Sequence, residues 1–407
     1  MPRVDQVKPG STRPSQRYTR VEPARARPTH AVRPWGALGA VVLIVVVECL
    51  LARHPLHLAD PVSLSWRHAA SLAANPNAKQ ILAGDSLIMH GVVPALMREQ
   101  TGLETVNLGA ARAPALFTYF LVRRVLESGV KPFSIVFCAK PAVLMGGPDY
   151  DARYWQEVLS PRELLDLAAM TGRGGLWLRL AAGRLIPSLR SRLEVRSWII
   201  ATLGGETNPI SATNRVLWRN WTVNQGANLA SAQSPFDGRL DAQVADRLHT
   251  DRFHVDRTNA LAIDRMLSLA AREHVLIYWL LPPISPALQA RRDQSGAEGE
   301  FEAFIQANLA RHPNAVVLDA RRSGFTNALF CDPTHLNVRG AVILTDLVTR
   351  ALTSSAHEPR WLPLESLKEP LPPEPAGLED VEESKAIVNA VPAPPQQTSE
   401  AIARPGG

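Results

Sequence analysis

The sequence predicts an α/β domain in which five parallel strands form one sheet with helices on both faces. Five short apolar runs alternate with stretches whose apolar residues recur every three or four positions, which is the helical period. The run 134–138 is apolar after its first residue, Ser134, as expected of a strand covered on both faces. Strands that alternate with helices in this way imply a parallel sheet whose crossover connections are right-handed.

The predicted elements follow one another from residue 78 to about residue 352. Strands are expected at 80–83, 105–107, 134–138, 275–281 and 315–319. Helices are expected from the end of the first strand to about residue 100, and at 114–127, 258–270, 301–309 and 339–352. Between the third and fourth strands, residues 145–255 break the alternation. They predict a mainly helical insertion that caps one end of the sheet, with helices at 164–170 and 176–193.

Both ends of the chain are expected to lack a fixed fold. Residues 1–34 contain eight Arg or Lys, six prolines and two acidic residues, and they show no apolar periodicity. Residues 361–407 contain nine prolines, eight acidic residues and three basic ones. These compositions predict a disordered basic arm and a disordered Pro-rich tail on either side of a domain at 78–360. The net charge of +6 thus comes mainly from the basic arm. The sequence has no basic stripe with interleaved aromatic residues, so nucleic-acid binding is not expected.

Residues 35–52 form an almost wholly apolar run of 18 residues, with Glu48 near its far end. A run of this length is just sufficient to span a bilayer. A cleaved signal peptide is one alternative, although it normally has a shorter apolar core and a small-x-small cleavage site. A buried soluble helix is another, although it would rarely be apolar on every face. The run favours a single-pass anchor, and the positive-inside rule then places the basic arm in the cytoplasm and the domain outside.

Ser86 is the candidate nucleophile. It follows the first predicted strand in Gly84-Asp85-Ser86, where the C-terminal edge of a parallel sheet gathers working residues. A serine hydroxyl needs a base, and His335 is the candidate. Asp332, three residues earlier, is placed to fix its tautomer. The alternative is that Asp332 and Pro333 only order a turn before the last helix. The three cysteines have no zinc spacing, and neither a metal nor a cofactor is expected.

Three motifs together resemble the SGNH (GDSL-like) hydrolase superfamily. They are Gly84-Asp85-Ser86, the turn Asn107-Leu108-Gly109, and the block Asp332-Pro333-Thr334-His335-Leu336-Asn337-Val338-Arg339-Gly340-Ala341. With an apolar segment ahead of the domain, the chain looks most like envelope proteins related to the alginate O-acetyltransferases and the D-alanyl transfer protein of teichoic acid synthesis. The resemblance covers residues 78–145 and 258–352, and it implies an SGNH-like, flavodoxin-like sheet.

The resemblance implies that Ser86 attacks an acyl carbonyl, that His335 moves the proton and that Asp332 holds His335. Backbone N–H groups of Ser86 and Gly109 would form part of the oxyanion hole, with Asp85 structural. The superfamily's oxyanion asparagine after the third strand is missing, because this chain has Ala139-Lys140-Pro141 there. Lys140 or Asn107 could donate instead, or backbone donors alone could suffice. The loss of one such donor typically costs on the order of 100-fold in rate.

The expected function is therefore a membrane-anchored serine acyl-transfer enzyme, an O-acyltransferase or esterase. It would act outside the cytoplasm on an envelope polysaccharide or a similar acyl ester. The partners implied are the membrane, an acyl donor, a hydroxyl-bearing acceptor and a membrane-bound acyltransferase. Two alternatives stay open: a hydrolase of small esters, and a non-catalytic envelope assembly or binding protein on the same fold.

Overall fold

The structure is a computed structural model of the 407-residue chain. It describes residues 34–52, 59–74, 77–148, 152–186, 188, 191–205, 209–241, 252–354, 359–367 and 377–390. The chain divides into two compact units, residues 1–47 and 48–407, and the second contains the α/β domain. Residues 1–33 of the predicted basic arm (1–34) and the last part of the predicted tail, residues 391–407, lie outside the described residues.

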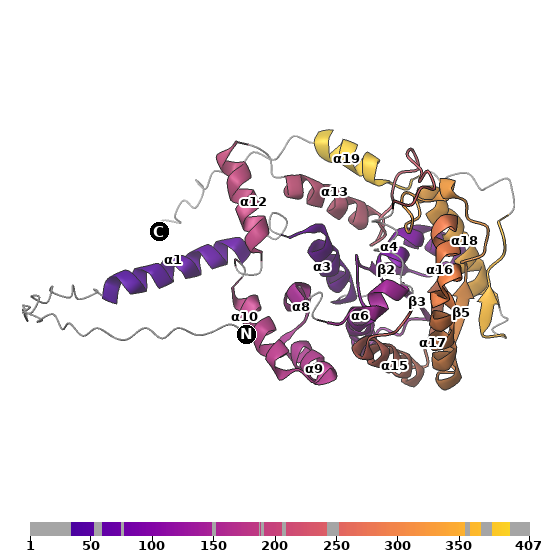
Figure 1. Cartoon of the computed structure of the whole chain (residues 1–407). Helices are drawn as coiled ribbons and strands as arrows, with labels where there is room; N and C mark the ends of the chain where they lie inside the picture. Colours follow the sequence, from indigo (N-terminus) through magenta and orange to yellow (C-terminus); the bar gives the residue numbers. More distant parts are fainter. Residues whose placement is uncertain are drawn as a thin grey trace, which may run out of the picture. The chain divides into compact units, whose positions relative to one another are not determined.

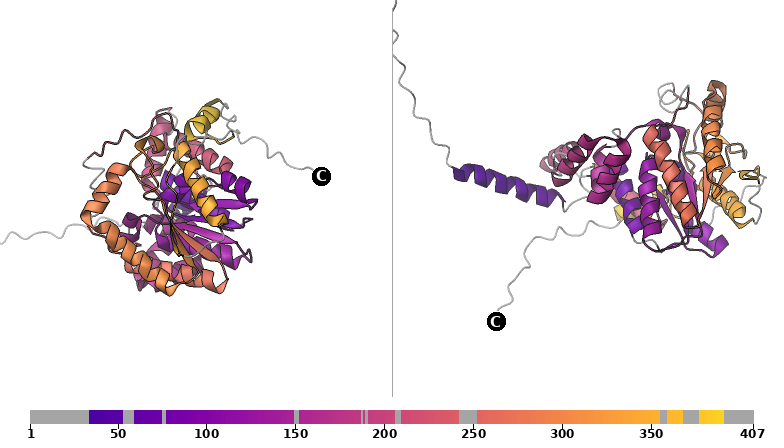
Figure 2. Two further views of the ribbon diagram at one scale, coloured as in Figure 1. Left: turned by 90° about the vertical axis from the view of Figure 1, so that its right-hand side faces the viewer. Right: turned by 90° about the horizontal axis from the view of Figure 1, so that it is seen from below.

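One parallel sheet with the strand order β2-β1-β3-β4-β5-β6 forms the centre of the domain (Figures 1 and 2). Its strands are β1 Gln80–Gly84, β2 Thr105–Gly109, β3 Ser134–Cys138, β4 Leu276–Leu281, β5 Ala315–Asp319 and β6 Trp361–Pro363. The first five lie at the predicted runs. The predicted count of five was wrong by one, because β6 pairs with β5 at the edge. A three-residue strand that ends in proline gives almost no periodic signal, and proline is tolerated on an edge strand.

Helices cover both faces of the sheet (Figure 2). Their bounds are α3 Pro61–Ala74, α4 Ser86–Gly91, α5 Pro94–Thr101, α6 Ala115–Glu127, α7 Pro141–Met145, α8 Ala152–Val158, α9 Pro161–Thr171, α10 Gly174–Leu185, α12 Arg192–Leu203, α13 Pro209–Val223, α15 Arg257–Arg272, α16 Pro286–Ser295, α17 Ala297–Arg311, η1 Asn327–Leu329, α18 Val338–Thr353 and α19 Val381–Ala390. Ile81 and Ala83 of β1 pack on the face of α3, α6 and α15, whereas Leu82 packs on the face of α4 and α18. This alternation buries both faces of each strand and explains why the strands read as continuous apolar runs.

Prolines divide two of the predicted helices. The helix expected before residue 100 is split into α4 and α5, and Pro94 is the first residue of α5. The helix expected at 176–193 is also two helices, since α10 ends at Leu185 and α12 begins at Arg192. Pro187 lies between them in the sequence, and proline interrupts a helix because it lacks the N–H donor.

Part of the predicted disordered tail is folded. Helix α19 packs on α13, where Asn220 and Asn224 both donate side-chain hydrogen bonds, each 2.8 Å long, to the backbone oxygen of Glu379. A capping box begins α19, because Asp380 and Glu383 each accept the other's backbone N–H, at 2.9 and 2.8 Å. These polar contacts leave little apolar periodicity, which is why composition alone predicted disorder.

The described residues of the first unit belong to helix α1, Pro34–Ala52, which covers the predicted membrane run. Large apolar side chains along it, from Leu38 to Leu50, are exposed. Within the part of the chain that the structure describes, no helix is both long and apolar enough to cross a membrane.

A buried histidine predicts how stability depends on pH. His68 of α3 packs against Trp218 and Trp221 of α13, with ring centroids 5.0 and 5.7 Å away. Neither ring nitrogen has a hydrogen-bond partner among the described residues, and burial lowers the pKa of His68 to about 4. The folded state therefore stays neutral at a pH at which the unfolded chain binds a proton. As a result, stability is lost as pH falls from about 6.5 towards 4.

We expect His68→Phe to reduce this acid sensitivity, because a phenyl ring fits the aromatic site and cannot bind a proton. The slope of the unfolding free energy between about pH 6 and 4 should fall by up to about 1.4 kcal/mol per pH unit. Urea unfolding at a series of pH values measures it. An unchanged slope would show that His68 does not carry the effect.

Candidate active site

The predicted site residues meet at one edge of the sheet, where the carboxyl ends of three neighbouring strands lie side by side. Gly84, the last residue of β1, is in register with Gly109 of β2 and Cys138 of β3. The strand order reverses at β1, which is where open α/β sheets hold their ligands. Gly84 has φ of +150°, and a Cβ there would lie 1.9 Å from the Cys138 carbonyl oxygen. Only glycine therefore lets the turn into α4 approach β3 so closely.

Ser86, His335 and Asp332 form a continuous hydrogen-bonded row. Ser86 Oγ lies 2.8 Å from His335 Nε2. On the other side of the ring, His335 Nδ1 lies 2.6 Å from Asp332 Oδ2. The serine is buried as the first residue of α4, and the histidine is half-buried. This is the arrangement in which an imidazole accepts the serine proton while a carboxylate fixes the tautomer of the ring.

The Asp-x-x-His spacing works because Asp332 both folds the turn and contacts the ring. Asp332 Oδ1 accepts the backbone N–H groups of Thr334 and His335, at 2.7 and 2.9 Å. The other carboxylate oxygen remains for the imidazole. The Ser285 N–H, just beyond β4, donates to the Pro333 oxygen at 3.0 Å and ties the turn to the sheet edge.

The same contacts keep Asp332 ionised. Burial alone would raise the pKa of Asp332. The hydrogen bond and charge of His335 oppose that effect, as do the N–H groups of Thr334 and His335, and they hold the pKa well below its ordinary value. Because the folded-state pKa is depressed, this pairing contributes stability that is present above the ordinary carboxyl pKa near 4 and lost as pH falls below it.

Asp85 has a structural role. It caps α4 by accepting the Leu87 N–H at 2.8 Å, and its second oxygen accepts the Lys140 N–H at 2.8 Å. It thereby links the β1 turn to the segment after β3. Burial raises the pKa of Asp85, although the charge of Lys140 and these N–H donors oppose that rise.

Two of the expected oxyanion donors form hydrogen bonds to other groups of the protein. The Gly109 N–H donates to Asn107 Oδ1 at 2.8 Å, so it is already bonded. The Asn107 side-chain amide donates to the backbone oxygens of Ile88 and Val92, at 2.9 and 3.0 Å. Asn107 is fully buried, and its hydrogen bonds link β2 to the end of α4, so its amide is not available to an oxyanion. The Ser86 N–H, at the start of α4, donates to no group among the described residues.

Lys140 is the fourth of the expected oxyanion donors. It follows β3, and its Nζ is 3.4 Å from Ser86 Oγ. An ammonium group beside the nucleophile is placed to hold negative charge that develops on a substrate oxygen. The Ser86 N–H and Lys140 are therefore the donors of the predicted set that face the site.

We expect Lys140→Met to lower kcat for an acyl ester by roughly 100-fold, because it removes one charged donor from the developing oxyanion. The backbone bond from Lys140 to Asp85 does not depend on the side chain, so the fold should persist. Steady-state kinetics with a chromogenic ester measure the effect, with Lys140→Arg as the matched variant that keeps the charge. Equal kcat in wild type and Lys140→Met would show that the Lys140 ammonium group does not stabilise the oxyanion.

His90 is a site residue that the sequence reasoning missed. It lies one helical turn after Ser86 on α4, and its ring centroid is 4.7 Å from that of His335. Burial lowers the pKa of His90 to about 3, and the charges of His335 and Lys140 add to this effect against the opposing charge of Asp332. His90 is thus a neutral ring that packs on the base. The i, i+4 spacing from Ser86 was the available signal, because it puts both side chains on one helix face.

Neither known protein families nor curated proteins give a match to this chain. Any inference about function therefore rests on the geometry of the site alone. Among the described residues, no group of three or more His, Cys, Asp or Glu side chains is arranged to hold a metal ion.

Proposed function

We propose that the protein is a serine acyl-transfer enzyme of SGNH type that moves an acetyl or similar acyl group. The observation that carries the proposal is the row from Ser86 through His335 to Asp332, with separations of 2.8 and 2.6 Å. The order β2-β1-β3-β4-β5 is the doubly wound order of flavodoxin-like sheets, and it supports the SGNH-like architecture.

In the first half-reaction, Ser86 Oγ attacks the carbonyl carbon of an acyl ester while His335 Nε2 takes the hydroxyl proton. The tetrahedral oxyanion is stabilised by the Ser86 N–H and the Lys140 ammonium. Its collapse breaks the bond to the leaving alcohol, which receives the proton from His335. The acyl group is then esterified to Ser86. Asp332 stabilises the imidazolium while it carries the proton.

In the second half-reaction, a hydroxyl group gives its proton to His335 and attacks the acyl carbon, and Ser86 recovers the proton on leaving. A sugar hydroxyl makes the reaction a transfer, and water makes it a hydrolysis. We propose transfer to an envelope polysaccharide or a similar hydroxyl-bearing polymer, with helix α1 as a membrane anchor and the domain outside the cytoplasm. This part of the proposal rests on the apolar run of residues 35–52 in the sequence and on the exposure of its large side chains.

The test is turnover of a chromogenic acetyl ester by the full-length protein in detergent, with and without an added oligosaccharide. We expect chromophore release in both cases, and acetylated oligosaccharide by mass spectrometry in the second. Release without any sugar product supports a plain esterase. No release from a series of acetyl and longer acyl esters, together with no acyl-Ser86 after acid quenching, would contradict the proposal and favour a non-catalytic binding protein.

A further inference from the structure

His90 has one ring nitrogen in the protein interior and the other at the active site. It lies one turn after Ser86 on α4, and helical side chains lean over the preceding turn, so its ring covers the turn that carries the nucleophile. Its ring centroid is 4.7 Å from that of His335. Nδ1 is sealed from solvent without a hydrogen-bond partner among the described residues, whereas Nε2 is not sealed and the residue is partly exposed. The open edge of the ring therefore faces the space beside the base.

The buried Nδ1 determines where the His90 ring carries its proton. Buried N–H groups without an acceptor are rare, because they lose their hydrogen bonds to water. The proton is therefore on Nε2, which makes this atom a hydrogen-bond donor. The ring is neutral, since burial lowers the pKa of His90 to about 3 and the nearby charges of His335, Lys140 and Asp332 do not restore it. A neutral donor does not repel His335 while that ring carries a proton.

The turn that carries His90 is fixed from two sides. The Asn107 amide of β2 donates to the Ile88 oxygen at 2.9 Å, and the Asn228 N–H, from the insertion, donates to the Met89 oxygen at 2.8 Å. Both bonds hold the backbone immediately before His90. A donor that is already in place costs less entropy when a ligand binds to it.

The second half-reaction limits which oxygen of an acceptor His90 can bind. The reacting hydroxyl gives its proton to His335 Nε2, while a lone pair of its oxygen attacks the acyl carbon on Ser86. A donor on that oxygen would occupy a lone pair and weaken the attack. A neighbouring hydroxyl group has no such conflict. Sugars carry hydroxyl groups on adjacent carbons, and water has no second hydroxyl group to offer.

We propose that His90 is a specificity-determining residue that donates from Nε2 to a second hydroxyl group of the acceptor, next to the one that reacts. The group recognised is thus a 1,2-diol, such as two adjacent hydroxyls of a sugar ring. Water and simple alcohols leave the donor unpaired and are therefore poorer acceptors. The inference rests on the proposed acyl-transfer function, and it adds the part of the acceptor that the site selects.

The test offers two matched acceptors to the acylated enzyme at once. Full-length protein in detergent receives a chromogenic acetyl ester with equal amounts of cis-cyclohexane-1,2-diol and cis-cyclohexane-1,4-diol. Gas chromatography then measures the two monoacetates. The diols differ only in whether their hydroxyl groups are adjacent. We expect the 1,2-diol to be acetylated roughly fivefold or more in excess, as one added hydrogen bond implies. The product ratio does not depend on how fast Ser86 is acylated.

Two substitutions separate the donor from the ring. His90→Phe keeps a ring beside His335 but has no donor, so the two monoacetates should form in equal amounts. His90→Gln places an amide donor near the position of Nε2 and should keep part of the preference. His312→Ala is the matched control, because His312 is a buried histidine just before β5, at the opposite edge of the sheet. Its loss should leave the product ratio unchanged.

Equal acetylation of the two diols by the wild type would overturn the proposal, and so would a preference that persists in His90→Phe. The wild-type comparison needs no variant, so it decides the question even where a substitution impairs folding. Absence of acyl-Ser86 in the acid-quenched wild type would instead refute the acyl-transfer function, and this inference with it. Acyl-Ser86 without a preference between the diols would refute the role of His90 alone.

Discussion

Replacing Ser86 by alanine should lower acyl-ester turnover by about a thousandfold or more. The Ser86 hydroxyl lies 2.8 Å from His335 Nε2, which is placed to take its proton. Without this hydroxyl, no acyl-enzyme can form on residue 86. The measurement is chromophore release by purified full-length variants, combined with mass spectrometry for acyl-Ser86.

His335→Ala should produce a loss of similar size, because the hydroxyl then has no base. The double variant should be hardly worse than either single one, since residues that act as a unit are not additive. Ser285→Ala is the matched control. Ser285 is a buried serine beyond β4, and it reaches the catalytic turn only through its backbone N–H. It should keep wild-type turnover.

Turnover that survives in both Ser86→Ala and His335→Ala would remove the triad from the mechanism. A loss of turnover in either variant is evidence for the triad only if that variant remains folded. Thermal unfolding of each variant within a few degrees of the wild type provides that check. If the variants unfold early, the presence or absence of acyl-Ser86 in the intact wild-type protein still decides the question.

The triad could be predicted from the sequence because each of its parts leaves a local signal. Ser86 follows an apolar run, and Asp332 and His335 lie three residues apart in one turn, so the rule that working residues gather at carboxyl ends of strands nominated all three. The resemblance of the surrounding motifs to the SGNH superfamily then joined them into one predicted site. The oxyanion donors could not be predicted in the same way. Whether the Gly109 N–H is available depends on the side chain of Asn107, two residues away, and that bond exists only once β2 and α4 are packed.

The edge strand and the helix held by polar contacts could not be predicted from the sequence. Strand β6 joins the sheet through three residues, and α19 is held to α13 by asparagine side chains and a capping box. Neither leaves the apolar periodicity on which strands and helices are recognised. The ionic network around Arg321 was also invisible, because Arg321 and its partner Glu298 are 23 residues apart and belong to different elements.

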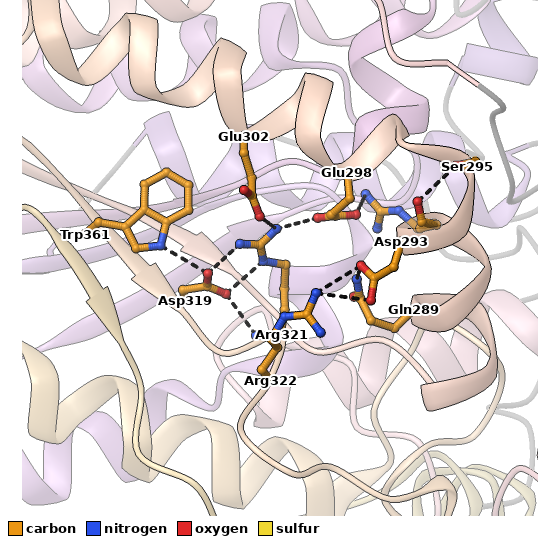
Figure 3. Close-up of polar contacts among 10 residues, drawn as sticks. Gln289, Asp293, Ser295, Glu298, Glu302, Asp319, Arg321, Arg322 and Trp361 are labelled. Carbon is orange, nitrogen blue, oxygen red and sulfur yellow. Dashed lines mark hydrogen bonds and ion pairs between the residues drawn. The ribbon is translucent and has the colours of Figure 1, made fainter.

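Arg321 lies at the centre of that network (Figure 3). It follows β5, and its guanidinium pairs with Asp319 at 2.5 Å and with Glu298 of α17 at 2.6 Å. All three side chains are largely buried. Arg292 of α16 pairs with the same Glu298 at 3.0 Å, and the Trp361 indole of β6 donates to Asp319 at 3.1 Å. The network thus joins the end of β5, two helices and the edge strand.

Replacing Arg321 by methionine should therefore lower the free energy of unfolding by about 3–5 kcal/mol, because it leaves the buried Asp319 carboxylate without its cation. Arg322→Met is the matched control. Arg322 is the next residue, is 71% exposed and pairs with Asp293 at 3.1 Å, so its loss should cost at most about 1 kcal/mol. Guanidinium unfolding of the full-length chain measures both. Equal costs for the two variants would show that burial of the network does not matter.

The penalty in Arg321→Met should also depend on pH, with a sign that identifies its cause. Burial alone would raise the pKa of Asp319, but in the wild type the hydrogen bonds and charge of Arg321 hold it below its ordinary value. The contribution of this pairing is present above the ordinary carboxyl pKa near 4 and is lost as pH falls below it. Without the cation, burial raises the pKa of Asp319, which can then take up a proton at mildly acidic pH. The difference between wild type and variant should thus shrink from neutral pH towards about pH 4, whereas a simple loss of packing would leave it constant.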